Sequence, residues 1–241
     1  MAARIQQALG DAKRVLNVGA GTGSYEPTGR CIAVEPSELM LSRRRPGSAP
    51  AVRAVAEQLP FPAQSFDAAI AIFTVHHWSD HRAGLAEVRR VAAGPIVVLT
   101  WDSDAFAQRF WLVRDYLPEA VATDRGLPSV SDIGAALGPH RVETLAVPHD
   151  CTDGFSAAYW RRPEMYLDPD ARAAISNLAL LPAGVVDRMA AALRADLDSG
   201  AWHRRNAELI DLEELDCGYR LLISDGRPGD DPRPADDSTR P

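Results

Sequence analysis

Residues 15–24 read V-L-N-V-G-A-G-T-G-S, an apolar run that stops abruptly at a set of alternating glycines. The apolar run is typical of a buried strand. Gly19, Gly21 and Gly23 follow it at every second position. Glycines in this pattern predict a loop whose backbone turns tightly and lies against a bulky ligand.

An acid at the end of the next apolar run narrows the kind of ligand. Residues 31–34 read C-I-A-V and are followed by Glu35. A carboxylate at the tip of a second strand can accept both hydroxyl protons of a ribose, so loop and acid together predict a nucleoside cofactor. A dinucleotide site requires G-x-G-x-x-G, and the G-x-G-x-G found here fails at the third glycine.

The remaining pattern predicts an α/β fold. Short apolar runs alternate with helical periodicity, which favours a doubly wound, mostly parallel sheet with ligands at the carboxyl ends of its strands. Residues 105–137 and 155–215 read mainly as helices, and the first ten residues as a short amphipathic helix. The expected strands are about 14–19, 31–35, 51–55, 66–73, 95–100, 141–147 and 217–223.

Composition excludes several classes of protein. The 241 residues carry a net charge of −7, which argues against a nucleic-acid backbone as the main partner. No run approaches the roughly 20 apolar residues that a membrane span needs. The three cysteines are far apart and lack C-x-x-C spacing, so we expect reduced thiols in a cytoplasmic protein, with no metal site.

Several motifs in order resemble the class I S-adenosylmethionine-dependent methyltransferases that act on small molecules. The resemblance covers residues 14–100 well and the rest by topology only. Its motifs are the glycines at 19–23, A-E-Q-L-P-F at 56–61, S-F-D at 65–67, T-V-H-H-W at 74–78 and L-A-E-V-R-R-V at 85–91.

The resemblance implies a seven-stranded, mostly parallel Rossmann-like sheet whose last strand is antiparallel. Residues 1–224 would form one domain, with residues 149–215 as a helical insertion that roofs the pocket before the last strand. Residues 225–241 have no large apolar side chain to anchor them, and we expect a disordered tail.

The resemblance also implies S-adenosylmethionine as the cofactor. Glu35 would bind the ribose, the backbone at Gly19–Gly21 would pass beneath the methionine part, and Ala56 would lie beside the adenine. The implied cofactor contacts are Asn17, Gly19, Ala20, Gly21, Tyr25, Glu35, Pro36, Ala56, Glu57 and Phe73.

Four features depart from the family pattern. Asn17 stands where Asp or Glu is common, and its amide offers no charge to the cofactor's ammonium. Val55 stands where an adenine-contacting Asp is usual. Little chain separates Gly23 from Glu35, so the crossover helix should be only a turn or so, starting at Ser24. Little chain precedes the first strand, so we expect closure over the acceptor from the insertion or another subunit.

Three side chains are candidates for catalysis. His76 and His77 fall where the acceptor should lie, and either could be a general base, while His77 could instead hold the turn by a hydrogen bond. Asp102, after the fifth strand, could be a base or could cap the next helix. Tyr25 could cover the methionine moiety or pack against Pro27.

The sequence thus predicts methyl transfer to oxygen, nitrogen or carbon of a small-molecule acceptor. It does not name the acceptor, and a monomer and a homodimer are both possible. Residues 74–77 contain no Asn-Pro-Pro-Tyr-like motif, which argues against a nucleobase amino group. Two other hypotheses stay open: an enzyme that uses the cofactor for cyclisation or rearrangement, and a non-catalytic cofactor-binding protein.

Overall fold

A seven-stranded sheet forms the centre of the protein. The computed structural model describes residues 1–123 and 126–225. Strands β1 to β5 run parallel, and β9 is antiparallel to both of its neighbours, β5 and β6. The order matches the mostly parallel, doubly wound sheet that the sequence predicts. The strands, in sheet order, are β3 (Ala51–Val52), β2 (Cys31–Val34), β1 (Val15–Val18), β4 (Ala68–Ile72), β5 (Ile96–Trp101), β9 (Tyr219–Ser224) and β6 (Arg141–Thr144).

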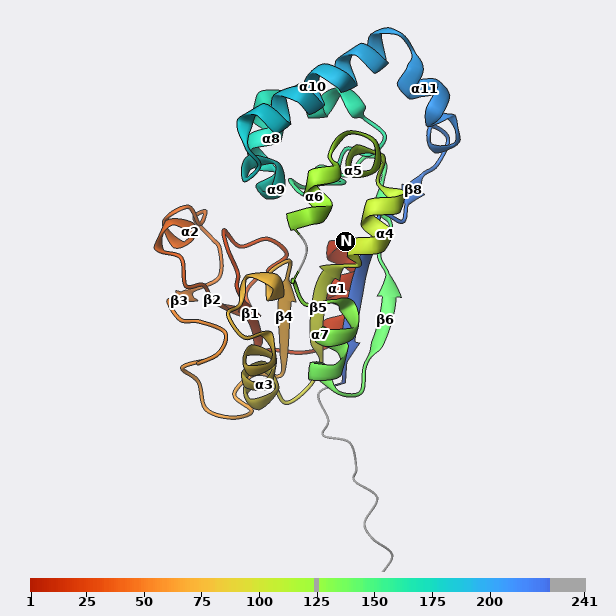
Figure 1. The fold of residues 1–241 in the computed structure, drawn as a ribbon. Helices are drawn as coiled ribbons and strands as arrows, with labels where there is room; N and C mark the ends of the chain where they lie inside the picture. Colours follow the sequence, from red (N-terminus) through yellow and green to blue (C-terminus); the bar gives the residue numbers. More distant parts are fainter. Residues whose placement is uncertain (124–125, 226–241) are drawn as a thin grey trace, which may run out of the picture.

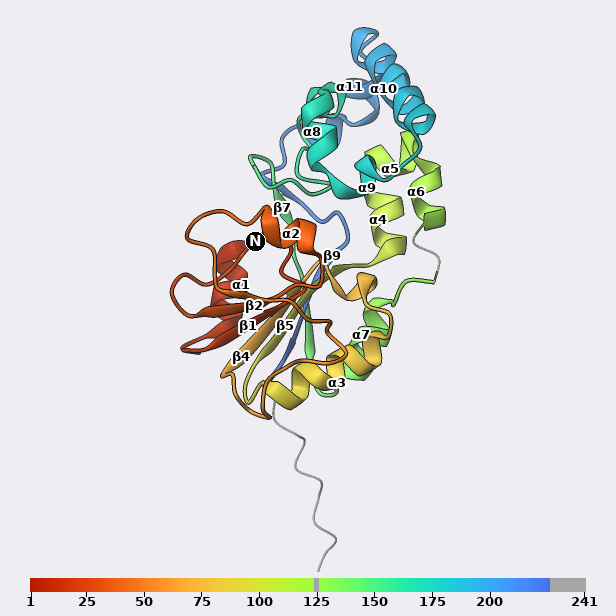
Figure 2. The same cartoon turned by 90° about the vertical axis from the view of Figure 1, so that its left-hand side faces the viewer.

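Helices cover both faces of this sheet (Figure 2). Helix α1 (Ala2–Leu9) packs on one face, and α3 (His81–Val91) with α7 (Val130–Leu137) on the other. The residues of β5 therefore alternate between two cores, with Val97 on the α1 side and Val98 on the α3 side. Burial on both faces explains why the central strands are continuous apolar runs.

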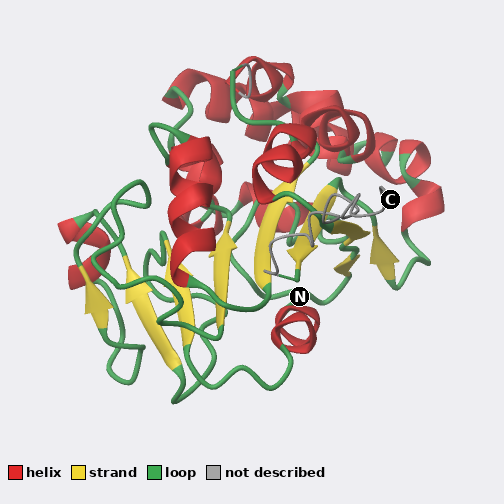
Figure 3. Cartoon of the chain, turned by 90° about the horizontal axis from the view of Figure 1, so that it is seen from below, coloured by secondary structure: helices red, strands yellow, loops and turns green. Residues whose placement is uncertain are grey.

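The remaining helices gather beyond the carboxyl ends of the parallel strands (Figures 1 and 3). We call residues 103–123 and 149–215 the cap. Its first part follows β5, and its second part lies between β6 and β9. The cap elements are α4 (Ser103–Arg109), α5 (Trp111–Tyr116), α6 (Pro118–Thr123), η2 (Pro163–Leu167), α8 (Pro169–Ala174), α9 (Ser176–Ala179), α10 (Ala183–Asp198), α11 (Ala201–Arg205), η3 (Ala207–Leu209) and β8 (Glu214–Leu215), which pairs with β7 (Val147–Pro148).

Buried tryptophans join the two parts of the cap. Trp111 Nε1 donates to the carbonyl oxygen of Trp160 at 2.7 Å, and its ring lies 5.2 Å from that of Trp202. Trp160 Nε1 donates to the carbonyl oxygen of Val147 at 2.9 Å. The roof over the carboxyl edge is therefore built from two segments, and not from the second one alone as the sequence suggested.

The expected crossover helix starting at Ser24 is wrong. Residues 19–30 form turns, and the next helix is α2 (Glu38–Ser42), after β2. Gly23 has a φ of 101° and Tyr25 a φ of 64°, and neither angle is compatible with a right-handed helix. Twelve residues separate β1 from β2, and none of them forms a helix.

The sequence also leads us to expect a disordered C-terminal tail and no membrane-spanning segment. The expected disordered tail, residues 225–241, lies outside the described residues except for Asp225. Across residues 1–123 and 126–225, no helix is both long enough and apolar enough to cross a membrane. The division into one domain with an insertion stays a prediction.

Candidate cofactor and active site

The glycine loop, residues 19–23, turns directly above the carboxyl end of β1. Gly19, Gly21 and Gly23 have φ angles of 68°, 52° and 101°, a region that only glycine enters without strain. The N–H of Gly19 donates to the carbonyl oxygen of Val34 at 2.8 Å, which ties the loop to β2. A Cβ atom added to Gly19 would lie 1.8 Å from Thr74 Oγ1, so the loop backbone touches the turn after β4.

Glu35 lies immediately after β2 and faces this loop. Its side chain is buried, and Oε2 accepts the N–H of Gly21 at 2.8 Å while Oε1 accepts the N–H of Ser37 at 2.8 Å. A carboxylate has about four acceptor positions, so two remain for a diol. The backbone thus presents Glu35 in one fixed orientation at the carboxyl edge.

Exposed apolar side chains follow Glu35 along α2 and also lie beyond β3. Leu39 and Met40 of α2 are 57% and 37% exposed, and Val55, beyond β3, is 46% exposed. Pro36 is also exposed. Leu39 and Met40 are not among the residues expected from the sequence, although two adjacent apolar residues shortly after the acid are a usable signal. Such a surface beside a carboxylate suits a flat ring.

The Ala56–Glu57 segment meets the start of α3. Ala56 is buried. Glu57 Oε1 accepts Ser79 Oγ at 2.8 Å and the N–H of Asp80 at 3.1 Å. Burial raises the pKa of Glu57, but these hydrogen bonds outweigh it and the net pKa is lowered. The carboxylate is therefore held by the turn before α3, and its contact with a cofactor stays a prediction.

Asn17 lies on β1 beneath the glycine loop, and Ala20 lies within the loop. Asn17 is only 1% exposed, and its Nδ2 donates to Glu26 Oε1 at 3.3 Å. The N–H of Ala20 donates to the carbonyl oxygen of Val34 at 3.0 Å. The amide of Asn17 is thus directed toward another acid of this chain.

The two histidines lie in η1 (Val75–His77), directly after β4. The His76 ring is 3.9 Å from that of His77 and packs edge-on against Trp101 at 4.6 Å. Burial, together with the neighbouring His77, lowers the pKa of His76 to about 3. Burial also lowers the pKa of His77, and the charge of Glu35 opposes this shift. Both imidazoles are therefore uncharged at neutral pH, and His77 lies close enough to Glu35 for that carboxylate to influence its pKa.

Phe73 connects β4 to η1 in an uncommon conformation. Its φ is 51°, which a bulky residue rarely adopts. Its ring lies 5.4 Å from that of Tyr219 and 5.9 Å from that of Phe155 in the cap. Phe73 therefore joins the end of β4 to the underside of the cap.

Asp102 and Tyr25 have clear structural partners. Asp102 caps α4, because its carboxylate accepts the N–H of Ala105 at 3.0 Å, so the capping alternative holds and a role as base stays a prediction. Tyr25 donates its hydroxyl to Asp153 Oδ2 of the cap at 2.5 Å. Burial and this hydrogen bond raise the pKa of Tyr25 well above its usual value. The Tyr25 hydroxyl thus links the glycine loop to the cap.

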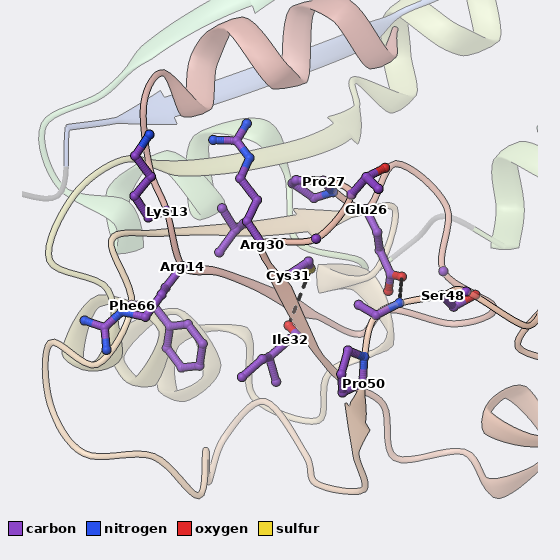
Figure 4. A pocket seen from close by; sticks show the side chains of 16 residues that line it. Lys13, Arg14, Glu26, Pro27, Arg30, Cys31, Ile32, Ser48, Pro50 and Phe66 are labelled. Atoms are coloured by element: carbon purple, nitrogen blue, oxygen red, sulfur yellow. Dashed lines mark hydrogen bonds between the residues drawn. The ribbon is translucent and has the colours of Figure 1, made fainter.

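A cavity of about 580 Å³ extends from the amino ends of β1, β2 and β4 to the turns at residues 23–30 (Figure 4). Its lining includes Lys13 and Arg14, just before β1, and Phe66, just before β4. The predicted cofactor residues do not line it. Ligands of parallel sheets bind at the carboxyl ends, so geometry favours the edge that carries Glu35. Among residues 1–123 and 126–225, no group of three or more His, Cys, Asp or Glu could hold a metal ion.

Comparison with known proteins identifies the family. A methyltransferase domain family matches residues 16–94. A solved structure from Anabaena variabilis, described as a candidate methyltransferase from an antibiotic biosynthesis pathway, is 33% identical, covers 92% of this chain and 95% of its own, and superposes with a TM-score of 0.85. The chain belongs to the class I S-adenosylmethionine-dependent methyltransferases.

Two other methyltransferases match the chain in fold or over part of its sequence. A SAM-dependent methyltransferase from Thermotoga maritima shares the fold at 17% identity, with a TM-score of 0.53 over 92% of this chain and 86% of that one. A demethylmenaquinone methyltransferase from a Mycobacterium species is 34% identical over 120 residues, 47% of this chain and 52% of its own length. The chain thus matches about half the length of such curated methyltransferases.

Proposed function

We propose that this methyltransferase moves the methyl group of S-adenosylmethionine to oxygen, nitrogen or carbon of a small-molecule acceptor bound beneath the cap. The observation that carries the proposal is the convergence at the carboxyl edge of the sheet of Glu35, the glycine loop and η1, where the charge of Glu35 acts on His77. The family and the fold support the choice of cofactor.

The residues present fit this cofactor. Glu35 keeps free acceptor positions for the two ribose hydroxyls. The exposed Pro36, Met40 and Val55 would hold the adenine by apolar contact. Gly19 and Gly21 have no side chains, so the methionine part of the cofactor could lie directly against their backbone, with the Ala20 methyl group as the one side chain in this segment.

The bound cofactor supplies an activated methyl group on a positively charged sulfur. A neutral His76 adds no repelling charge near that sulfur, because its pKa of about 3 leaves it unprotonated. The imidazole can accept a hydrogen bond from the acceptor and orient it for in-line attack. An imidazole with such a low pKa is a weak base, so it suits an acceptor that loses its proton only after methyl transfer or that has no proton to lose.

Aromatic side chains below the cap favour a flat acceptor. Trp101, Phe73 and Phe155 are each only partly buried there. The Mycobacterium relative is named as a demethylmenaquinone methyltransferase, so we include demethylated quinols in the acceptor panel, beside phenols and amines.

The test is transfer of label from methyl-labelled S-adenosylmethionine to this panel, with product identification by mass spectrometry. Label in an acceptor, lost when Glu35 is replaced by Gln, would support the proposal. Consumption of the cofactor without a methylated acceptor would replace it with cyclisation or rearrangement chemistry. Binding of S-adenosylhomocysteine without any turnover across the panel would favour a non-catalytic role.

A further inference from the structure

The glycine loop lacks the support that a crossover helix would give. Residues 19–30 form turns, and below them lies the cavity of about 580 Å³ (Figure 4). Its lining includes Gly23, Glu26 and Ala49, so the space borders the loop itself. Something else must fix the loop conformation.

A buried ion pair holds the loop instead. Arg44, which follows α2, places Nη2 2.6 Å from Glu26 Oε1, and each side chain is only 7% exposed. Arg44 Nη2 also donates to the carbonyl oxygen of Ala49 at 2.9 Å, and the N–H of Ala49 donates to Glu26 Oε2 at 2.9 Å. Every one of these bonds involves a charged group, the class that contributes most to stability.

Arg44 also forms a hydrogen bond with the glycine loop itself. Its Nη1 donates to the carbonyl oxygen of Gly21 at 3.2 Å, while the N–H of Gly21 donates to Glu35 at 2.8 Å. The carbonyl oxygen of Gly21 is thus held by Arg44, and its N–H by Glu35. Gly23 packs on the same pair, because a Cβ there would lie 3.1 Å from Glu26 Oε2.

The pair also explains Asn17, the departure from the family pattern. Asn17 Nδ2 donates to Glu26 Oε1 at 3.3 Å, a bond that a carboxylate at position 17 could not make while ionised. One arginine faces one acid in this arrangement, and an Asp at position 17 would add a second negative charge beside Glu26. In this chain the buried acid beneath the glycine loop is Glu26, whereas in the family an acid is common at the position of Asn17.

We propose that Glu26 and Arg44, with Asn17, form a loop clamp that positions the glycine loop and Glu35 for the cofactor in place of the missing crossover helix. The clamp acts through Gly21 and not by touching the acceptor, so its members are positioning residues. The inference rests on the proposed use of S-adenosylmethionine.

The experiment measures the dissociation constant of S-adenosylhomocysteine and the thermal unfolding midpoint for wild type and three variants. Arg44→Lys keeps the charge but loses the planar fork that reaches Gly21 and Ala49 together. E26Q/R44M removes both charges at once, so no unpaired charge stays buried. Arg90→Lys is the matched control, because Arg90 pairs with Glu87 and donates to two carbonyl oxygens, but in the loop at residues 59–61.

The clamp predicts about a tenfold or larger rise in the dissociation constant for Arg44→Lys and for E26Q/R44M, and less than about twofold for Arg90→Lys. In turnover, the loss should fall on KM for the cofactor more than on kcat. E26Q/R44M should stay folded, so its weaker binding separates positioning from stability.

Two results would overturn the clamp while leaving the proposed function intact. Wild-type binding by Arg44→Lys would do so, and so would wild-type affinity in a folded E26Q/R44M. Absence of binding by the wild-type protein would instead overturn both the proposed function and the clamp.

Discussion

Replacing Gly19 by Ala tests how closely the glycine loop is fitted to the turn after β4. At a φ of 68°, an L-residue costs about 1–2 kcal/mol in a left-handed conformation. The new Cβ would also lie 1.8 Å from Thr74 Oγ1 and 2.7 Å from Thr74 Cβ, against the 3.0 Å that real contacts respect. Overpacking adds about 1–3 kcal/mol, so the expected loss in free energy of unfolding is about 2–5 kcal/mol.

Gly21→Ala is the matched control for this prediction. Gly21 has a φ of 52°, but a Cβ there would meet nothing within 4 Å, so only the backbone strain of about 1–2 kcal/mol applies. Urea unfolding of the ligand-free proteins, followed by tryptophan fluorescence, measures both losses. Adding Thr74→Gly should reduce the cost of Gly19→Ala in a double-mutant cycle. Equal stability of the two alanine variants would refute the steric reasoning.

Three further predictions concern charged and polar groups. The pKa of His76 is lowered from 6.5 to about 3, so below pH 6.5 the unfolded chain binds a proton that the native protein does not bind. The stability that this histidine contributes is therefore fully present above pH 6.5 and is lost as the pH falls toward 3. The expected loss in free energy of unfolding is about 2 kcal/mol at pH 5. Urea unfolding at pH 7 and pH 5 should show this loss shrink in His76→Phe, and an unchanged loss would contradict it. Asn17→Asp should destabilise the protein by about 2 kcal/mol at pH 7 through repulsion from Glu26, and a free energy of unfolding equal to that of the wild type would argue against this. Tyr25→Phe should lower the free energy of unfolding by about 1 kcal/mol through loss of its hydrogen bond to Asp153, and equal denaturation midpoints would count against it.

The sequence predicted the parts of the fold that are encoded locally. The apolar runs before Gly19 and Glu35 are buried strands, and the motifs that follow lie on β4, η1 and α3 in the expected order. Hydrophobic periodicity encodes the strands within a few residues, whereas the order of the motifs was expected from the resemblance to the methyltransferase family.

What the sequence did not predict depends on distant contacts. The two-part cap is held by rings at positions 111, 160 and 202, whose proximity no local pattern encodes. The Glu26–Arg44 pair joins residues 18 positions apart, with β2 and α2 between them. The helix expected at Ser24 failed because positive φ angles at Gly23 and Tyr25, imposed by the tight crossover, outweighed helical propensity.

The central claim is that the cofactor binds at the carboxyl edge of the sheet, against Glu35. A crystal structure of the protein with S-adenosylhomocysteine tests it most directly. We expect both ribose hydroxyls to lie within hydrogen-bonding distance of the Glu35 carboxylate and the sulfur to face His76 and Trp101. A ligand bound in the cavity at the amino edge, or a ribose away from Glu35, would contradict it.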